Sequence, residues 1–170
     1  KWAHMLWPAS SKVGEVVVAS IGIPPSVATQ LNLRDEVLTP SMIRSRMPIR
    51  SSIGHKGSFG HLCVIGGSRW MPGAPQYSME AAYRMGAGLV TLALPTTLAQ
   101  ALIGKLKLPL FWPWEEEGVH FAVSSVDGKD FQAYSALAIG PGISCWEGGE
   151  QWLEQILEQS TQPLVLDADA

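Results

Sequence analysis

The sequence predicts an α/β protein with a layered parallel sheet, because strand-like and helix-like patterns alternate along it. Short apolar runs bounded by glycine or proline are separated by longer segments with helical periodicity, which is typical of strands joined by crossover helices. One complete unit of this kind occupies residues 55–95: a strand, a glycine-rich loop, a helix and a second strand. Strands connected in this way run parallel with a right-handed crossover, and the alternation along the whole chain predicts a sheet with helices on both faces.

The composition is that of a folded globular chain and excludes two classes of partner. Hydrophobic residues make up 46% of the 170 residues, which is enough for a buried core. The net charge is −3 and no cluster of lysines and arginines is present, so nucleic acid is not an expected partner. No apolar stretch approaches the roughly 20 residues of a membrane span, and the N-terminal segment lacks the apolar core of a signal peptide.

The two cysteines carry no signal of redox or metal chemistry. Cys63 lies within a predicted strand and Cys145 within a predicted loop, and neither has the CxxC or Cys/His spacing of such a site. We therefore expect a buried thiol, an ordinary loop thiol and no protein-bound metal centre. Reduced thiols suit a cytoplasmic protein.

The first fifty residues contain few expected elements. Residues 13–21 (VGEVVVASI) match a strand that the following glycine and prolines end. Short helices are predicted over 26–33 and 39–46, and the second begins with Thr39 as N-cap and a proline at the first helical position. The composition changes from strand-like to polar over residues 26–38, which we interpret as a linker.

The rest of the chain continues the alternation of strands and helices. The helix after the glycine loop carries Ala81 and Ala82, small residues that allow close packing on a sheet, and the Gly-Ala-Gly that follows marks its end. Residues 108–118 contain two prolines and two tryptophans, and we interpret them as an irregular segment whose tryptophans pack or lie at the surface. The expected strands are 62–65, 89–94, 136–139 and 163–166, and the expected helices are 75–86, 96–107 and 147–158.

Special residues follow three of the expected strands. Glycines and small residues occupy 66–74, Gly-Pro-Gly occupies 140–142, and Asp167 and Asp169 follow the last strand. In open parallel sheets ligands bind at the carboxyl ends of the strands, so these segments are candidates for one site. Asp167 and Asp169 are expected to alternate along the strand, so their side chains point to opposite faces and only one faces the cleft, where it binds Mg²⁺ or a substrate hydroxyl.

The glycine loop at 66–74 fits neither of two common phosphate-binding patterns. Its glycines do not fall as GxGxxG and no Gly-Lys-Ser/Thr follows them; the chain also lacks the GxSxG of serine hydrolases. Two interpretations remain, a tight turn with close helix packing or a loop whose backbone N–H groups contact phosphate, and the density of small residues favours the second. Lys56, just ahead of the first strand, is either a solvated turn residue or a counter-charge to that phosphate.

The order of these motifs resembles one enzyme family. HKGSFGHLCVIGGS, then AAYRMGAGLVTLALP, AIGPGI and PLVLDADA match the pattern of the ADP-dependent NAD(P)H-hydrate dehydratases. Residues 1–25 resemble the end of the epimerase domain that precedes the dehydratase in bifunctional forms. The resemblance implies a tail of an epimerase-like domain at 1–25, a linker at 26–38, and the N-terminal part of a dehydratase domain at 39–170.

The resemblance implies a ribokinase-like fold, a three-layer α/β/α sheet of which this chain holds only the N-terminal part. Such enzymes use ADP or ATP, with Mg²⁺, to phosphorylate the ring hydroxyl of hydrated NADH or NADPH (NADHX or NADPHX). Elimination then restores the dihydronicotinamide, and bifunctional forms also interconvert the R and S hydrates. The intact enzyme is expected to be a homo-oligomer with a small-molecule nucleotide substrate.

The resemblance also assigns the site residues. The GxGD aspartate expected as general base lies beyond Ala170 in the family pattern, so no catalytic residue is identified and the 170 residues alone are expected to be inactive. Two alternatives stay open: a ribokinase-like kinase for a vitamin-precursor alcohol, and a non-catalytic nucleotide-binding module. The residues expected to bind substrate are Lys56, Gly67, Gly73, Ala74, Gly140, Gly142, Asp167 and Asp169.

Overall fold

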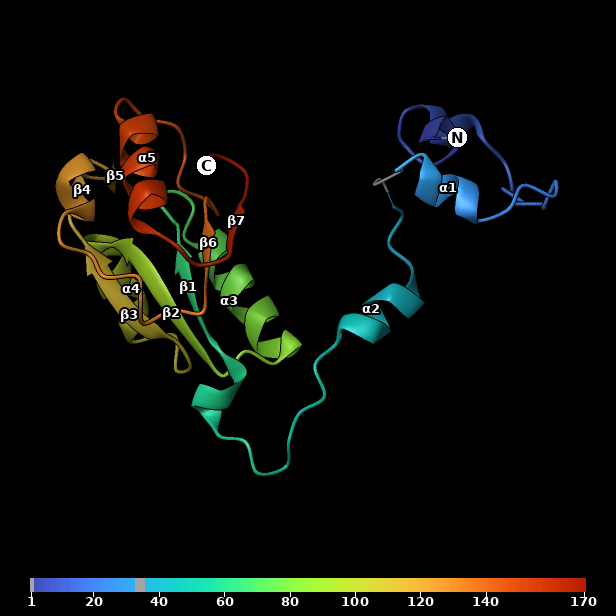
Figure 1. The fold of residues 1–170 in the computed structure, drawn as a ribbon. Helices are drawn as coiled ribbons and strands as arrows, with labels where there is room; N and C mark the ends of the chain where they lie inside the picture. Colours follow the sequence, from blue (N-terminus) through green and yellow to red (C-terminus); the bar gives the residue numbers. More distant parts are fainter. Residues whose placement is uncertain (1, 33–35) are drawn as a thin grey trace. The chain divides into compact units, whose positions relative to one another are not determined.

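The computed structural model describes residues 2–32 and 36–170, and the chain divides into two compact units (Figure 1). The first unit is Lys1–Ile49 and the second is Arg50–Ala170. The boundary between them lies downstream of the linker expected at 26–38. Each unit is described by itself.

The first unit contains short helices and no strand among its described residues. The strand predicted at 13–21 is wrong: the segment is in no sheet, and Val17 and Val18 remain 77% and 92% exposed. A strand is stable only when neighbours complete its hydrogen bonds, and β propensity alone supplies none. The helices are η1 (Trp2–His4), η2 (Ala9–Lys12), α1 (Ser26–Gln30) and α2 (Pro40–Arg46).

Both predicted helices of this unit are present. The end predicted for the first of them, Leu33, lies outside the described residues. The N-cap predicted for α2 is confirmed, because the Met42 N–H donates to Thr39 Oγ1 over 3.3 Å.

The second unit is built on a five-stranded sheet in which all pairs are parallel. The strand order is β3-β2-β1-β6-β7, so β1 lies at the centre. A separate two-stranded antiparallel sheet pairs β4 (Glu116–Glu117) with β5 (His120–Phe121). The five strands are β1 (His61–Ile65), β2 (Leu89–Pro95), β3 (Leu110–Trp114), β6 (Ala136–Ile139) and β7 (Leu164–Leu166).

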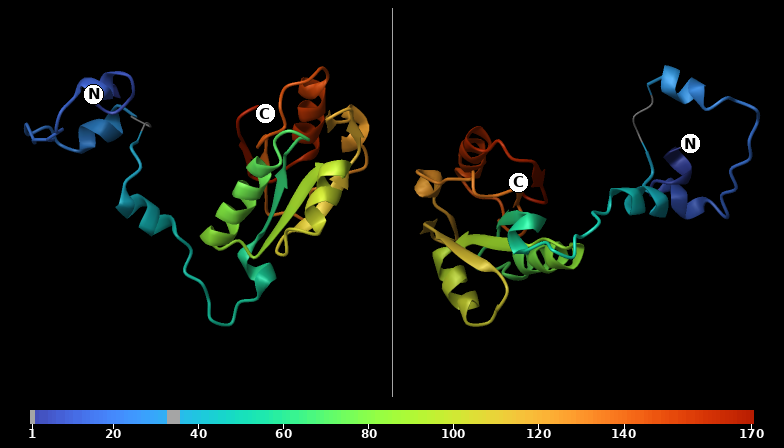
Figure 2. Two further views of the ribbon diagram at one scale, coloured as in Figure 1. Left: turned by 180° about the vertical axis from the view of Figure 1, so that it is seen from behind. Right: turned by 60° about the horizontal axis from the view of Figure 1, so that its bottom comes forward.

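Helices cover both faces of this sheet, which confirms the predicted three layers (Figures 1 and 2). α3 (Gly73–Met85) and α4 (Thr96–Ile103) pack on the face that carries Val64 and Leu92. α5 (Gly149–Gln159) packs on the opposite face through Trp152 and Ile156. The sheet thus separates two apolar clusters.

The segment 108–118 was expected to be irregular, and this prediction is wrong because it contains β3. Pro113 lacks an N–H and is tolerated in β3 because that strand lies at the edge of the sheet. Trp114 is fully buried, as expected for a packing residue. α4 ends at Ile103, earlier than the predicted Lys107, and α3 ends at Met85, one residue before the predicted Gly86, whose φ is +101°.

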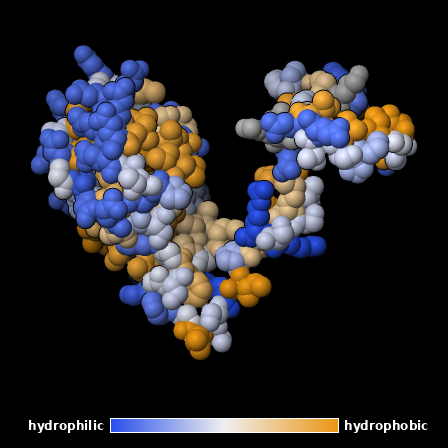
Figure 3. All heavy atoms as spheres, viewed as in Figure 1, coloured by the Kyte–Doolittle hydropathy of each residue, from blue (hydrophilic) through white to orange (hydrophobic). Residues whose placement is uncertain are grey.

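The outer surface of α5 is polar and the surface beside it is apolar (Figure 3). Glu150, Glu154 and Glu158 are all exposed on α5, which confirms the predicted solvated face. At the edge of the sheet, Val165 and Leu166 of β7 are 64% and 46% exposed. Among the described residues no helix has both the length and the apolar character needed to cross a bilayer.

Candidate functional site

The loops after β1, β6 and β7 meet at the carboxyl edge of the sheet. Gly142 fits closely against the first of them, because a Cβ at this position would lie 2.8 Å from Met71 O and 3.1 Å from the Ala74 Cβ. Gly140, with a φ of +115°, similarly abuts the backbone carbonyl of Asp167. The structure therefore brings the three predicted segments together, and glycine is required where they touch.

The first glycines of the loop after β1 serve the fold. The Gly66 N–H donates to Ala93 O over 3.1 Å, and the Gly67 N–H donates to Pro141 O over 2.8 Å. A Cβ on Gly67 would also lie 2.7 Å from the Leu98 Cδ2. Both amides already have acceptors, so the expectation that they point at phosphate is wrong for these two residues. Gly67 is a packing and turn residue that connects two loops.

The first N–H groups of α3 also lie at this edge. Gly73 and Ala74 are its first two residues, and the N-cap Pro72 provides no side-chain hydrogen bond. The first N–H groups of a helix have no intrahelical acceptor and carry a partial positive charge. The first turn contains no acidic residue, so nothing there competes for an anion.

The two aspartates lie in a turn beyond β7, not along a strand, so the prediction that they alternate between faces is wrong. β7 ends at Leu166, and the Asp167 N–H donates to Ile139 O over 2.9 Å. Asp169 Oδ2 accepts the Ser144 N–H over 3.1 Å. Both aspartates are exposed, and Asp169 joins this turn to the loop after β6.

Lys56 is at the other edge of the sheet. It begins η3 (Lys56–Phe59), and its carbonyl abuts Gly88, the residue just before β2. β1 runs for five residues from this edge to the glycine loop, and each residue of a strand advances about 3.3 Å. That span exceeds the reach of a lysine side chain. The structure brings together the other seven expected residues and leaves Lys56 apart from them.

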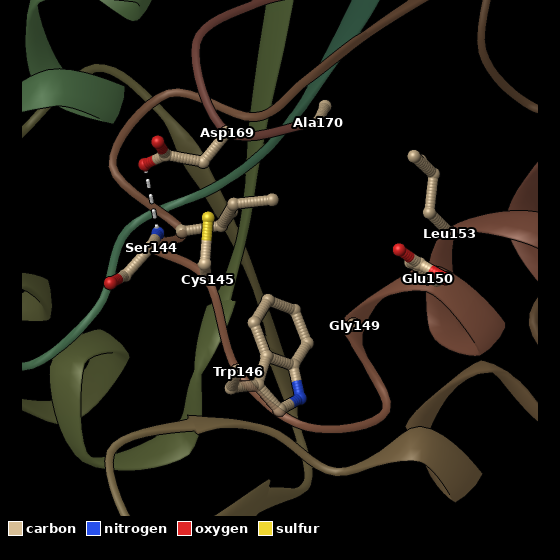
Figure 4. A pocket seen from close by; sticks show the side chains of 9 residues that line it. Ser144, Cys145, Trp146, Gly149, Glu150, Leu153, Asp169 and Ala170 are labelled. Atoms are coloured by element: carbon tan, nitrogen blue, oxygen red, sulfur yellow. Dashed lines mark hydrogen bonds between the residues drawn. The ribbon is translucent and has the colours of Figure 1, made fainter.

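A cavity of about 340 Å³ adjoins the loops after β6 and β7 (Figure 4). Its walls come from the loop after β6, the start of α5 and the turn after β7, and they include Asp169. The sequence reasoning missed Ser144 and Trp146, although they lie two and four residues after Gly142. The sequence feature that could have identified them is their position in the loop that begins with Gly140, which was already expected to line the site.

The groups with shifted pKa values lie away from this cavity, around the amino-terminal half of β1. Burial raises the pKa of the Cys63 thiol, which is fully buried as predicted. Burial also raises the pKa of Tyr134 to about 12 and lowers the pKa of His61. A buried thiol with a raised pKa is a poor nucleophile, so this cluster is structural. Among the described residues, no three His, Cys, Asp or Glu side chains are grouped to hold a metal.

The parallel sheet, its two helical layers and the loops that converge at its carboxyl edge define an α/β protein of the ribokinase-like class. Residues 62–170 match the NAD(P)H-hydrate dehydratase family model. The chain belongs to the NAD(P)H-hydrate dehydratase family.

Individual relatives agree with this assignment. The chain is 33% identical to the bifunctional NAD(P)H-hydrate repair enzyme of Moorella thermoacetica in an alignment of 170 positions that covers 96% of this chain and 31% of that enzyme. It is 28% identical to the ADP-dependent (S)-NAD(P)H-hydrate dehydratase of Bacillus subtilis over 134 residues, 78% of this chain and 45% of that enzyme. The chain therefore spans about a third of the bifunctional relative and under half of the dehydratase.

A solved structure supports the fold. The ADP/ATP-dependent NAD(P)H-hydrate dehydratase of Bacillus subtilis, co-crystallised with ATP and Mg²⁺, superimposes with a TM-score of 0.64 at 27% identity. The match covers 78% of this chain and 45% of that chain.

Proposed function

We propose that the protein containing this chain repairs hydrated NADH and NADPH by ADP- or ATP-dependent dehydration of the S hydrate. The observation that carries the proposal is the convergence of the loops after β1, β6 and β7 in a chain of this family. The relatives at 33% and 28% identity are named for this repair reaction. In this proposal the chain provides the substrate-binding wall of the site.

The residues of this wall have separate roles in the proposal. The amides of Gly73 and Ala74 hold an anionic group of the nucleotide at the start of α3. Gly140 and Gly142 keep the opposing loop free of side chains, so a ligand can approach the backbone. The nucleotide donor, when bound, supplies the phosphoryl group that turns the ring hydroxyl into a leaving group, and the protein contributes position and charge.

Asp167 fits a magnesium ion bound together with phosphate. It offers carboxylate oxygens at the carboxyl edge of the sheet, and these are the ligands that Mg²⁺ prefers. Among the described residues no three His, Cys, Asp or Glu side chains are grouped there, so phosphate oxygens and water would complete the coordination. Asp169, which already accepts the Ser144 N–H, is left for a hydroxyl group of the ligand.

The proposal also covers the division of this chain into parts that resemble those of the bifunctional relatives. Residues 1–25 would be the end of an epimerase-like domain that interconverts the R and S hydrates, 26–38 the linker, and 39–170 the N-terminal part of the dehydratase domain. Similarity to the bifunctional enzyme over 96% of the chain supports this division. We also infer a homo-oligomer in the cytoplasm.

Regeneration of NADH tests the proposed function directly. The full-length protein that carries this chain is incubated with NADH hydrate and ADP or ATP, and the absorbance of NADH is followed. Nucleotide-dependent recovery of NADH from the S hydrate supports the proposal. Phosphorylation of a vitamin-precursor alcohol without such recovery would instead identify a ribokinase-like kinase, and tight nucleotide binding without any turnover would identify a binding module.

A substitution at Ala74 tests the role of the α3 N-terminus. Ala74→Asp should lower the affinity for hydrated nucleotide at least about tenfold, because the new carboxylate repels phosphate. An acidic residue in the first helical turn does not destabilise the helix, so folding should be retained. Ala81→Asp is the matched control, since Ala81 is an exposed residue in the middle of α3. Unchanged affinity of the Ala74 variant by calorimetry would contradict the assignment.

A further inference from the structure

The cavity beside the loop after β6 differs in chemistry from the start of α3. Its volume of about 340 Å³ lies within the roughly 300–1,000 Å³ of small-molecule sites. Glu150, Asp169 and Ser144 are among the residues that line it, and no lysine or arginine is. A phosphate group would be repelled here. Hydroxyl groups of a neutral ligand would find acceptors instead.

One wall of the cavity is the aromatic ring of Trp146 (Figure 4). The ring of Trp146 stacks on His120, with centroids 5.2 Å apart and planes inclined by 2°. Trp152 meets it edge-on at 5.4 Å. His120 is itself fixed, since its Nδ1 lies 3.3 Å from Ile143 O. These contacts orient Trp146 before any ligand arrives.

Gly149 leaves part of this ring uncovered. A Cβ at position 149 would lie 3.3–3.4 Å from three carbon atoms of the Trp146 ring, which is the spacing of stacked rings. Gly149 is the first residue of α5 and also lines the cavity. Its backbone is not left-handed, so the turn does not require glycine there. Glycine at position 149 therefore keeps part of the Trp146 ring accessible from the cavity.

We propose that this cavity binds the adenosine part of a nucleotide, with the aromatic base on Trp146 and the ribose hydroxyls on Glu150 and Asp169. Asp169 Oδ2 accepts the Ser144 N–H, which orients the carboxylate and leaves Oδ1 for a hydroxyl. Acidic side chains hold ribose hydroxyls in other nucleotide sites by the same chemistry. The inference rests on the proposed function, in which the phosphates of the nucleotide lie nearer the start of α3.

Binding of adenosine monophosphate to the full-length protein tests the assignment. Trp146→Leu removes the aromatic surface and should weaken binding at least tenfold. Gly149→Ala places a methyl group over the ring and should weaken it several-fold, while alanine at the first position of α5 is compatible with the helix. Gly104→Ala is the matched control, because a Cβ there would meet nothing within 4 Å, and it should leave binding unchanged.

The affinity for inorganic phosphate, measured in the same variants, distinguishes a local effect on the cavity from misfolding. This affinity should be the same in all variants, whereas loss of phosphate binding together with adenosine monophosphate binding would attribute the effect to the fold and overturn the proposal. Wild-type affinity for adenosine monophosphate in both Trp146→Leu and Gly149→Ala would also overturn it. Displacement of adenosine monophosphate by ADP but not by NADH assigns the adenosine to the phosphoryl donor, and the reverse assigns it to the substrate.

The assignment and the proposed function can fail separately. If the wild-type protein regenerates NADH while the two variants bind adenosine monophosphate normally, the cavity assignment is wrong and the repair function stands. If both variants lose this binding but the wild type regenerates no NADH, the cavity assignment stands and the repair function is wrong.

Discussion

Gly142 and Gly128 share a left-handed backbone but differ in what surrounds them. Their φ values are +72° and +68°. A Cβ at Gly142 would lie 2.8 Å from Met71 O, whereas a Cβ at Gly128 would meet nothing within 4 Å. The difference separates two reasons for glycine at a site, the conformation of the turn and the approach of another loop.

Alanine at these two positions should therefore have unequal effects. Gly128→Ala should lower the free energy of unfolding by about 1–2 kcal/mol through backbone strain alone. Gly142→Ala should lower it by about 2–4 kcal/mol, because the glycine loop must also move. Urea denaturation of the two variants measures the difference. Equal losses would show that the loops do not press on each other at Gly142.

His61 makes stability depend on pH. Its Nε2 lies 2.8 Å from Thr91 Oγ1, and burial lowers its pKa below the ordinary value of about 6.5. The unfolded chain then binds the proton more readily than the folded chain, so stability should decrease as the pH falls below about 6.5 toward the folded-state pKa. His61→Gln should reduce this dependence between about pH 7 and pH 5. Parallel pH curves for wild type and variant in thermal denaturation would argue against a role for His61.

Among single residues, Trp146 could not be predicted from the sequence because tertiary packing sets its orientation. Its orientation depends on His120, which is distant in the sequence and has no pattern that links it to Trp146. The Gly-Pro-Gly at 140–142 could be found because the backbone itself requires glycine there. A side chain that is positioned by tertiary packing produces no comparable pattern in the sequence.

At the scale of helices and strands, apolar patterns predict four of the five strands of the parallel sheet and miss β3, which has a proline inside it. β1, β2, β6 and β7 were found because short apolar runs alternate with helices. β3 was missed because an edge strand tolerates the prolines that exclude a central one. Residues 13–21 have the same apolar character as a strand, yet no described strand pairs with them.

α5 is attached to the sheet by one side, and its residues should differ accordingly. Ile156 is fully buried while its neighbour Leu157 is 37% exposed. Ile156→Ala should lower the free energy of unfolding by about 2–5 kcal/mol, because it leaves a cavity in the core. Leu157→Ala should cost about 1 kcal/mol or less. Chemical denaturation tests this, and similar losses for both variants would contradict the packing described for α5.

At the scale of the whole molecule, the edge strand β7 is a surface open to further pairing in the second unit. It pairs with β6 on one side, and among the described strands none pairs with its other side. Val165 is 64% exposed on it. An apolar edge of this kind is a template for strand addition.

The 170-residue chain should therefore self-associate through β7. Val165→Lys should reduce this association, since a charge at an edge opposes pairing. Ile103→Lys is the matched control, because Ile103 is 52% exposed at the end of α4. Sedimentation over a range of concentrations measures both. A monodisperse monomer in the wild type, or equal effects of the two substitutions, would rule out association through β7.

The separation of the two apolar clusters by the sheet has a consequence for how this site tolerates change. The glycine loop rests on the α3 and α4 side, where Gly67 meets Leu98 and Pro75, while the wall at Trp146 rests on Trp152 of the other side. Substitutions that share no contacts are usually additive in energy. Mutations can therefore change the affinity for the anionic group of a ligand without changing the stacking of its aromatic base on Trp146, and the reverse. The two properties can evolve independently.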